Sequence, residues 1–287
     1  MIERLNFYDV YGYLLPGLAL LGVIWFPFWF VAGFTLPASA LSSALFALVV
    51  AYVIGHLLQG IARTALRQER PEKGNRVPSD YVLDRNEPSL RNEVRARVID
   101  LILTHFSLNV DAPVNAGELT SRRREAFLLC RRALVQQKAG SYAEQFEGMY
   151  ALMRGLAAVA GFSASYHLGW AGGQAIPTRL TTYLGWGLAG LCVVAAFAVF
   201  VTSVRQSPIL FWTLAIALLP LGAVLGSSFK TVSSLGDIAV LVVVASGSLF
   251  SGRLFHQAYQ YFGNEFAATV YRDFYVLNQM ATSERPR

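Results

Sequence analysis

Three polar side chains fall on one face of an otherwise apolar stretch of this 287-residue chain. They are Tyr52, His56 and Gln59, and Arg63 follows on the same face. Polar side chains in a membrane helix turn towards protein or water, and a histidine there can exchange protons. The functional interpretation is a proton-sensitive or pore-lining stripe near the cytoplasmic mouth of a membrane protein. The structural alternative is a set of interhelical hydrogen bonds that fix the packing.

A second candidate is Asp237, which follows the hydroxyl-rich loop at residues 226–234. Several subunits around one axis would bring their Asp237 carboxylates into a ring, and such rings select cations. The alternative is an ordinary solvated loop in which Asp237 pairs with Lys230, because ionisable groups near the end of a span can pair or reach water.

The third candidate is a basic surface formed by eight arginines of one polar region. These are Arg91, Arg95, Arg97, Arg122, Arg123, Arg124, Arg131 and Arg132. A nucleic acid or a nucleotide ligand is one partner for such a surface. Anionic lipid headgroups are the favoured partner, because each base near the membrane surface contributes about 1 kcal/mol of attraction.

No motif indicates catalysis. The four histidines are dispersed and have no zinc-site spacing, and neither a P-loop nor a G-x-S-x-G nucleophile motif is present. Gly185-x-Gly187-x-x-Gly190 matches the dinucleotide-binding string but begins an apolar run. Like Gly222-x-x-x-Gly226, it indicates close packing of membrane helices. We therefore expect no enzymatic activity, no catalytic residues, no metal and no cofactor.

The elements that position these residues are mostly apolar. Hydrophobic residues make up 54% of the chain and charged residues only 15%, a balance typical of proteins in lipid. Residues 10–62 contain no Asp, Glu, Lys or Arg and are long enough for two spans, placed near 13–34 and 39–61. Further apolar runs predict spans at 155–178, 180–204, 206–229 and 236–255. The fold class is thus an all-α, multi-pass transmembrane protein with about six spans.

The distribution of basic residues predicts the topology. With six spans, only Arg179 and Lys230 of the 24 lysines and arginines face outward. Such enrichment on one side is the bias of a bacterial inner-membrane protein with cytoplasmic bases. We therefore expect a multi-pass inner-membrane protein with both termini in the cytoplasm.

Four segments follow from this pattern. Residues 1–62 form an amphipathic lead-in and a transmembrane hairpin, 63–150 a cytoplasmic helical insert, 151–255 a four-span bundle and 256–287 a cytoplasmic C-terminal helix. Within the insert, the spacing predicts a helix over 89–106 with Leu90, Val94, Val98 and Ile102 inward. A second helix follows Glu118 to about 137, and a third begins at Ser141 and continues into the next span.

The C-terminal helix carries an aromatic stripe at three- and four-residue spacing. Its members include Phe255, Tyr259, Phe262, Phe266 and Phe274. A stripe of this kind needs a partner, and it is a candidate surface for assembly with a copy of itself. The alternative partner is the protein's own insert, since most helical stability comes from tertiary burial.

Two segments carry a resemblance to a known group of proteins. Phe7-Tyr8-Asp9-Val10-Tyr11-Gly12-Tyr13-Leu14-Leu15-Pro16-Gly17 and Tyr52-x-x-Gly55-His56-x-x-Gln59 are similar to the opening hairpin of bacterial multi-pass inner-membrane proteins from anti-phage defence clusters. The likeness covers about the first 62 residues and includes no catalytic motif. It implies an effector that a cytosolic sensor switches on to damage or depolarise the inner membrane.

The leading functional hypothesis is a homo-oligomeric membrane effector that forms a pore or perturbs the bilayer when its cytoplasmic insert receives a signal. Its partners would be the lipid bilayer, further copies of the chain and a cytosolic sensor protein, with nucleic acid less favoured. The alternative is a non-conducting anchor or scaffold that recruits a soluble partner. A small-solute transporter is the third hypothesis, which predicts an internal repeat among the last four spans.

Overall fold

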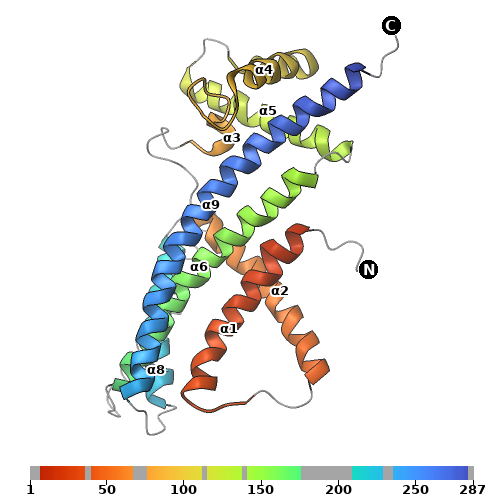
Figure 1. The fold of residues 1–287 in the computed structure, drawn as a ribbon. Coiled ribbons are helices and arrows are strands. Elements are labelled where there is room, and N and C mark those ends of the chain that lie inside the picture. Colours follow the sequence, from red (N-terminus) through yellow and green to blue (C-terminus); the bar gives the residue numbers. More distant parts are fainter. Residues whose placement is uncertain are drawn as a thin grey trace. The chain divides into compact units, whose positions relative to one another are not determined.

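The computed structural model describes residues 7–35, 40–66, 76–111, 115–137, 141–175, 209–228 and 235–283. Within these ranges the chain is helical and contains no β-strand, so the predicted all-α class is confirmed. The helices in chain order are η2 (Asp9–Leu14), α1 (Leu15–Phe30), α2 (Ala40–Ala65), α3 (Pro78–Tyr81), α4 (Asn92–Phe106), α5 (Ala116–Gln136), α6 (Ser141–Ala175), α8 (Ile209–Ser228) and α9 (Leu235–Ser283), and Figure 1 labels all of these except η2.

The chain forms two compact units. The first, here called the membrane unit, comprises Met1–Arg67 and Ala151–Ala258. The second, here called the module, comprises Gln68–Tyr150 and Tyr259–Arg287. The C-terminal part of α9 therefore belongs to the same compact unit as the insert, and α6 and α9 each contribute residues to both units.

Three stretches of the described residues are long and apolar enough to cross a membrane. They are Asp9–Phe30, Ala44–Ala65 and Leu235–Met280, and Thr213–Ser228 is a shorter apolar helix. These helices indicate a membrane-embedded protein. The first span begins at Asp9, before the predicted residue 13, because a π-helical turn leads directly into α1. The predicted span at 180–204 lies outside the described residues.

The predicted span at 155–178 lies in the interior of the membrane unit over its described residues, unlike the three apolar stretches. Residues 155–175 form the second half of α6, whose side chains from Ala151 to Gln174 are mostly buried, and residues 176–178 lie outside the described ranges. This half of α6 is the core of the membrane unit, whereas the three apolar stretches expose many large hydrophobic side chains, such as Phe46, Val243 and Trp29. An inner helix meets other helices rather than lipid, so it can carry glycines and polar side chains.

The module packs around one hydrophobic core. Leu90, Val98 and Ile102 are buried as their spacing predicted, and Val94 packs against the same core. Helix α5 begins at Ala116, two residues before Glu118, because the Asn115 side chain caps it by accepting a hydrogen bond from the Glu118 backbone N–H at 2.9 Å. Figure 1 shows α4 and α5 against the C-terminal part of α9, which supplies buried residues to this core.

Candidate intramembrane polar site

Glycines allow α6 and α8 to approach closely inside the membrane unit. A Cβ atom on Gly169 or Gly173 of α6 would collide with the backbone of α8. In return, a Cβ atom on Gly222 or Gly226 of α8 would collide with the backbone of α6. The predicted packing role of Gly222-x-x-x-Gly226 is therefore confirmed, and its partner is a second small-residue repeat on α6.

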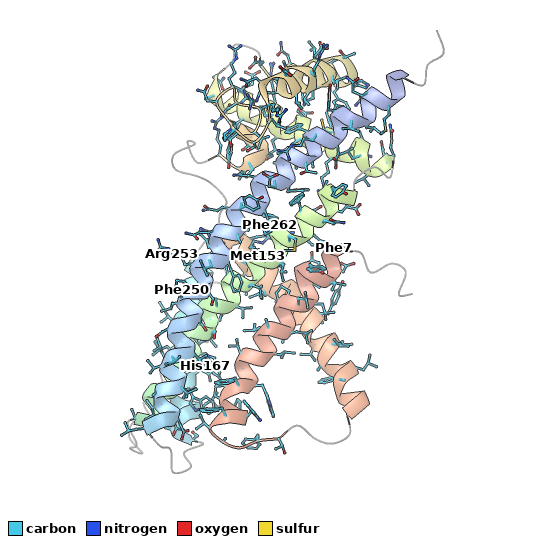
Figure 2. All side chains as sticks on the ribbon, viewed as in Figure 1. Phe7, Met153, His167, Phe250, Arg253 and Phe262 are labelled. Carbon is cyan, nitrogen blue, oxygen red and sulfur yellow. The ribbon has the colours of Figure 1, made fainter. Side chains whose placement is uncertain are left out.

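The same helix carries a line of buried polar side chains, here called the α6 polar stripe: Ser163, His167 and Gln174. Their exposed fractions are 3%, 1% and 2%. Positions four and seven residues apart return to nearly the same helical face, so the three side chains line one side of α6. Figure 2 marks His167 on this helix. Ser248 of α9 joins the stripe, because its Oγ lies 2.8 Å from the Ser163 Oγ.

The directions of the hydrogen bonds assign the His167 tautomer. The Ser248 hydroxyl donates to the Val244 carbonyl at 2.8 Å, so it accepts the bond from Ser163. The His167 Nδ1 lies 3.1 Å from the Ser163 Oγ and 2.8 Å from the Ser163 carbonyl oxygen. Because that carbonyl can only accept, Nδ1 carries the hydrogen and Nε2 keeps its lone pair.

This tautomer argues against a serine–histidine nucleophile. A general base needs its lone pair within hydrogen-bonding reach of the hydroxyl that it activates. The nitrogen near Ser163 is the donor, and the basic Nε2 of His167 is buried without a hydrogen-bond partner among the described residues. The stripe thus offers an unoccupied acceptor instead of a catalytic dyad.

Gln174 extends the stripe towards the far end of α6. Its Nε2 donates to the Gly226 carbonyl at 2.5 Å. Its Oε1 is buried and finds no hydrogen-bond partner within the described ranges. An unsatisfied buried acceptor costs about 1–3 kcal/mol, so each such atom favours binding of water or another donor.

Aromatic rings surround the histidine. The Phe26 ring centroid of α1 lies 5.7 Å from that of His167, and the Tyr166 centroid lies 5.6 Å away. The Tyr166 hydroxyl donates to the Ile24 carbonyl at 3.4 Å. In the described part of the membrane unit the only carboxylates are Asp9 and Asp237, at helix starts. Among the described residues, the side chains that contact the His167 ring are uncharged.

Of the polar face predicted on α2, Gln59 points inward. Its Nε2 donates to the Gly12 carbonyl at 2.7 Å and to the Ala151 carbonyl at 2.6 Å. Its Oε1 accepts from the Nε of Arg154 at 2.8 Å. The Gln59 amide thus joins α2 to η2 and to α6. This arrangement agrees with the alternative that the polar side chains of α2 form interhelical hydrogen bonds.

Tyr52 and His56 lie elsewhere on that helix. His56 is exposed, and its ring centroid lies 3.6 Å from that of Tyr13 and 4.6 Å from that of Tyr52. Arg63 is also exposed and donates to the Tyr8 hydroxyl at 3.2 Å. These side chains contact the beginning of the first span and do not share the interior with Gln59.

Other sequence candidates lie at the edge of the structure or beyond it. Asp237 occupies the first turn of α9, where a negative charge favours helix formation. Lys230, its expected partner, lies outside the described residues, as does the Gly185-x-Gly187-x-x-Gly190 string.

The eight arginines of the predicted basic surface have different environments in the module. Arg95 and Arg123 are buried, with exposed fractions of 3% and 4%, so their assignment to a surface was wrong. Arg95 donates to the carbonyls of Arg85, Glu87 and Leu90 and thereby closes the loop before α4. Burial lowers the pKa of Arg95 below its ordinary value.

Arg123 is the centre of an ion-pair network. It pairs with Asp84 and donates to the carbonyls of Val110 and Asp80. Arg76 also pairs with Asp84, at 2.6 Å. Burial raises the pKa of the Asp84 carboxyl, but the hydrogen bonds and charges of Arg76 and Arg123 outweigh it, so the pKa lies below the ordinary value.

The other arginines remain at the surface. Arg122 pairs with Glu118, Arg124 with the fully buried Asp80, and Arg131 with Glu147. Of the eight arginines, Arg91, Arg97 and Arg132 are exposed and form no ion pair within the described ranges. The available positive charge is thus smaller than the sequence indicated.

The aromatic stripe of the C-terminal helix has its partner in the protein's own insert. Tyr259 stacks on Tyr150, with ring centroids 4.7 Å apart. Phe262 meets Phe146, Phe266 meets Phe127, and Phe274 meets Phe106, at centroid separations of 6.3, 5.6 and 5.7 Å. Tyr259 and Phe274 are buried in the module, so the interpretation as an assembly surface was wrong for these two. Phe262 and Phe266 are half-buried, and their part in assembly stays a prediction. Phe255 lies in the membrane unit and is half-buried.

Sequence reasoning did not select the α6 polar stripe. One signal was present, because His167 and Gln174 interrupt the charge-free run 155–178 and lie seven residues apart, about two helical turns. The contribution of Ser248 carried no such signal, since it comes from a helix 85 residues away.

Comparison of this chain with protein-family models, with curated proteins and with solved structures found no match, and so none that links it to the anti-phage defence proteins.

Proposed function

We propose that this protein is a membrane effector that conducts ions across the bilayer and that a partner on its module increases this flux. The observation that supports this function best is the course of α6. The helix runs without a break from Ser141 to Ala175, contributes to the core of the module and carries the polar stripe in the membrane unit. A change in the module can therefore reach the polar stripe through one continuous helix.

Polar side chains within membrane spans usually mark a functional site, because they are costly to bury in lipid. The α6 polar stripe has two acceptors, the His167 Nε2 and the Gln174 Oε1, that lack hydrogen-bond partners among the described residues. Close glycine contacts hold α6 against α8 in this conformation. We propose that a shift of α6 relative to α8 admits water to the stripe.

The proposed setting is the bacterial inner membrane, with the module and both termini in the cytoplasm. The bias of basic residues supports this orientation. A cytosolic sensor protein is the proposed partner of the module. The proposed homo-oligomer would use surfaces other than Tyr259 and Phe274, because these two side chains are buried in the module.

Ion flux in liposomes tests the proposal. The purified full-length chain is placed in vesicles of phosphatidylethanolamine and phosphatidylglycerol, and flux of K⁺, Cl⁻ and H⁺ is followed with fluorescent reporters. We expect flux above that of empty vesicles, and a loss of flux in Gln174→Leu. Gln257→Leu is the matched control, because Gln257 is exposed on α9. Silent vesicles, together with an unchanged membrane potential in cells that express the protein, would overturn the proposal.

A non-conducting scaffold is the second candidate function. Leu128 and Val135 are 55% and 56% exposed on α5, and the exposed Arg132 lies between them in the sequence. Positions 128, 132 and 135 share one helical face. An apolar face with an unpaired base suits a docked protein, and silent vesicles would favour this function over the effector.

A further inference from the structure

We infer that the conducted ion is the proton, and that the Nε2 atom of His167 is the group that accepts and releases it. This inference rests on the proposed conducting function and adds the identity of the ion. It is carried by the hydrogen-bond directions around His167 and by the uncharged, tightly enclosed surroundings of its ring.

The first step is the state of the imidazole ring. The Val244 carbonyl accepts from Ser248, Ser248 accepts from Ser163, and the Ser163 oxygens accept from Nδ1 of His167. Nε2 therefore holds a lone pair. That atom is fully enclosed and has no hydrogen-bond partner among the described residues. A proton, delivered by a hydronium ion, supplies the missing interaction.

The second step is an exit for the proton. Ser163 and Ser248 are hydroxyls that can donate and accept, and their oxygens are 2.8 Å apart. When a hydronium ion gives H⁺ to Nε2 and becomes water, the imidazolium passes its Nδ1 hydrogen to the Ser163 oxygen. The Ser163 hydrogen moves to Ser248, and the Ser248 hydrogen leaves to water. One H⁺ enters, one leaves, and the ring becomes the other neutral tautomer until the protons return or the ring turns.

The third step excludes larger cations. The groups that face His167 are Ser163 and Tyr166 of α6 and Phe26 of α1, with Ser248 of α9 behind Ser163. None of these side chains is charged, and Tyr166 is the only other ionisable one among them. A dehydrated K⁺ ion needs a shell of several oxygen ligands, such as ring-like sets of carbonyls. Among the described residues, two hydroxyls, the Ser163 carbonyl and one ring nitrogen do not form such a shell, whereas a proton needs only one lone pair.

Paired flux measurements test the inference. Vesicles with the full-length protein contain pyranine for H⁺, and parallel vesicles report Tl⁺ as a substitute for K⁺. We expect H⁺ flux without Tl⁺ flux, and a decrease of H⁺ flux by about tenfold or more in His167→Gln, since general acid–base groups contribute about 10²–10⁴-fold to proton transfer. His256→Gln is the control for loss of a histidine on a neighbouring helix.

A second pair of variants keeps the test valid if His167→Gln does not fold. Ser248→Ala removes the exit hydroxyl, whereas Ser246→Ala removes an exposed hydroxyl two residues away on α9. We expect H⁺ flux to fall in Ser248→Ala and to stay unchanged in Ser246→Ala. H⁺ flux that is equal in all the variants, or Tl⁺ flux above that of empty vesicles, would overturn the proton relay while the conducting function stands. No flux of any ion would overturn both.

Discussion

Replacing Arg123 with glutamine is expected to make local unfolding of the module more frequent. The same change at the adjacent Arg122 is expected to have little effect on this local unfolding. The Arg123 side chain is 5% exposed and pairs with Asp84. The Arg122 side chain is 31% exposed and pairs with Glu118 one helical turn away. The two variants therefore lose the same charge from neighbouring positions with different burial.

The expected cost follows from this difference. Loss of one partner from a buried ion pair costs about 3–5 kcal/mol. Asp84 keeps its pair with Arg76, and its side chain is 27% exposed, so we expect about 2–3 kcal/mol for Arg123→Gln. An exposed helical pair contributes about 0.3–0.5 kcal/mol, which is the expectation for Arg122→Gln.

The thiol of Cys130 reports the opening. It is fully buried in the module core, and burial raises its pKa to about 12. A thiol reagent therefore labels it only when the module opens. In full-length protein with Cys192→Ser, which leaves one cysteine, labelling should accelerate roughly 30- to 150-fold in Arg123→Gln, since about 1.4 kcal/mol is tenfold. Arg122→Gln should change the rate by about twofold.

Equal labelling rates in the two variants would refute the assignment of Arg123 as the central structural cation of the module. An accelerated rate in Arg122→Gln alone would show that the ion pair with Glu118 carries the stability instead. The helix content of each variant before labelling, measured by circular dichroism, distinguishes local opening from global unfolding.

Three further predictions concern other contacts. The folded-state pKa of Asp84 lies below its unfolded value, so the stability that it contributes is present above about pH 4 and is lost as the pH falls through the folded-state value. Pepsin should therefore cut the module increasingly as the pH falls over that range. The Asp84→Asn variant should lack this pH-dependent increase. Gly169→Leu should lower the melting temperature in detergent by separating α6 from α8, at a cost of about 1–3 kcal/mol or more, whereas Gly172→Leu enters open space and should not. Gln59→Leu removes three buried hydrogen bonds and should destabilise the membrane unit by about 1–3 kcal/mol for each unsatisfied group, as measured by thermal unfolding, whereas the exposed His56→Leu should be tolerated.

The helices of this protein follow largely from local sequence patterns. Charge-free runs predicted the two spans of the first hairpin and the span that begins α9, because a membrane-crossing helix must be apolar over about 20 residues. They also predicted α8, which is apolar but shorter than a span over its described residues. The fourfold spacing of Leu90, Val98 and Ile102 predicted the buried face of α4. The continuation of α6 from Ser141 into the next segment was also predicted, and no proline interrupts the helix.

Partner choice over long sequence separations required the tertiary structure. Periodicity showed that the aromatic stripe needs a partner, but it could not distinguish Phe127 of the same chain from a second copy, because either would bury the same apolar area. Side chains of Arg122, Arg123 and Arg124 point about 100° apart around one helix, and only packing decides which is buried.

The same limit applies to the candidate site. The sequence by itself determined that His167 lies in an apolar helix, and its local composition shows no charge nearby. Only the structure brought Ser248 to Ser163 and buried the stripe among other helices, since the contact between Ser163 and Ser248 joins residues 85 positions apart. Hydrogen bonds are short-range and directional, so their donors and acceptors are paired by the packing of helices and not by the order of the residues along the chain.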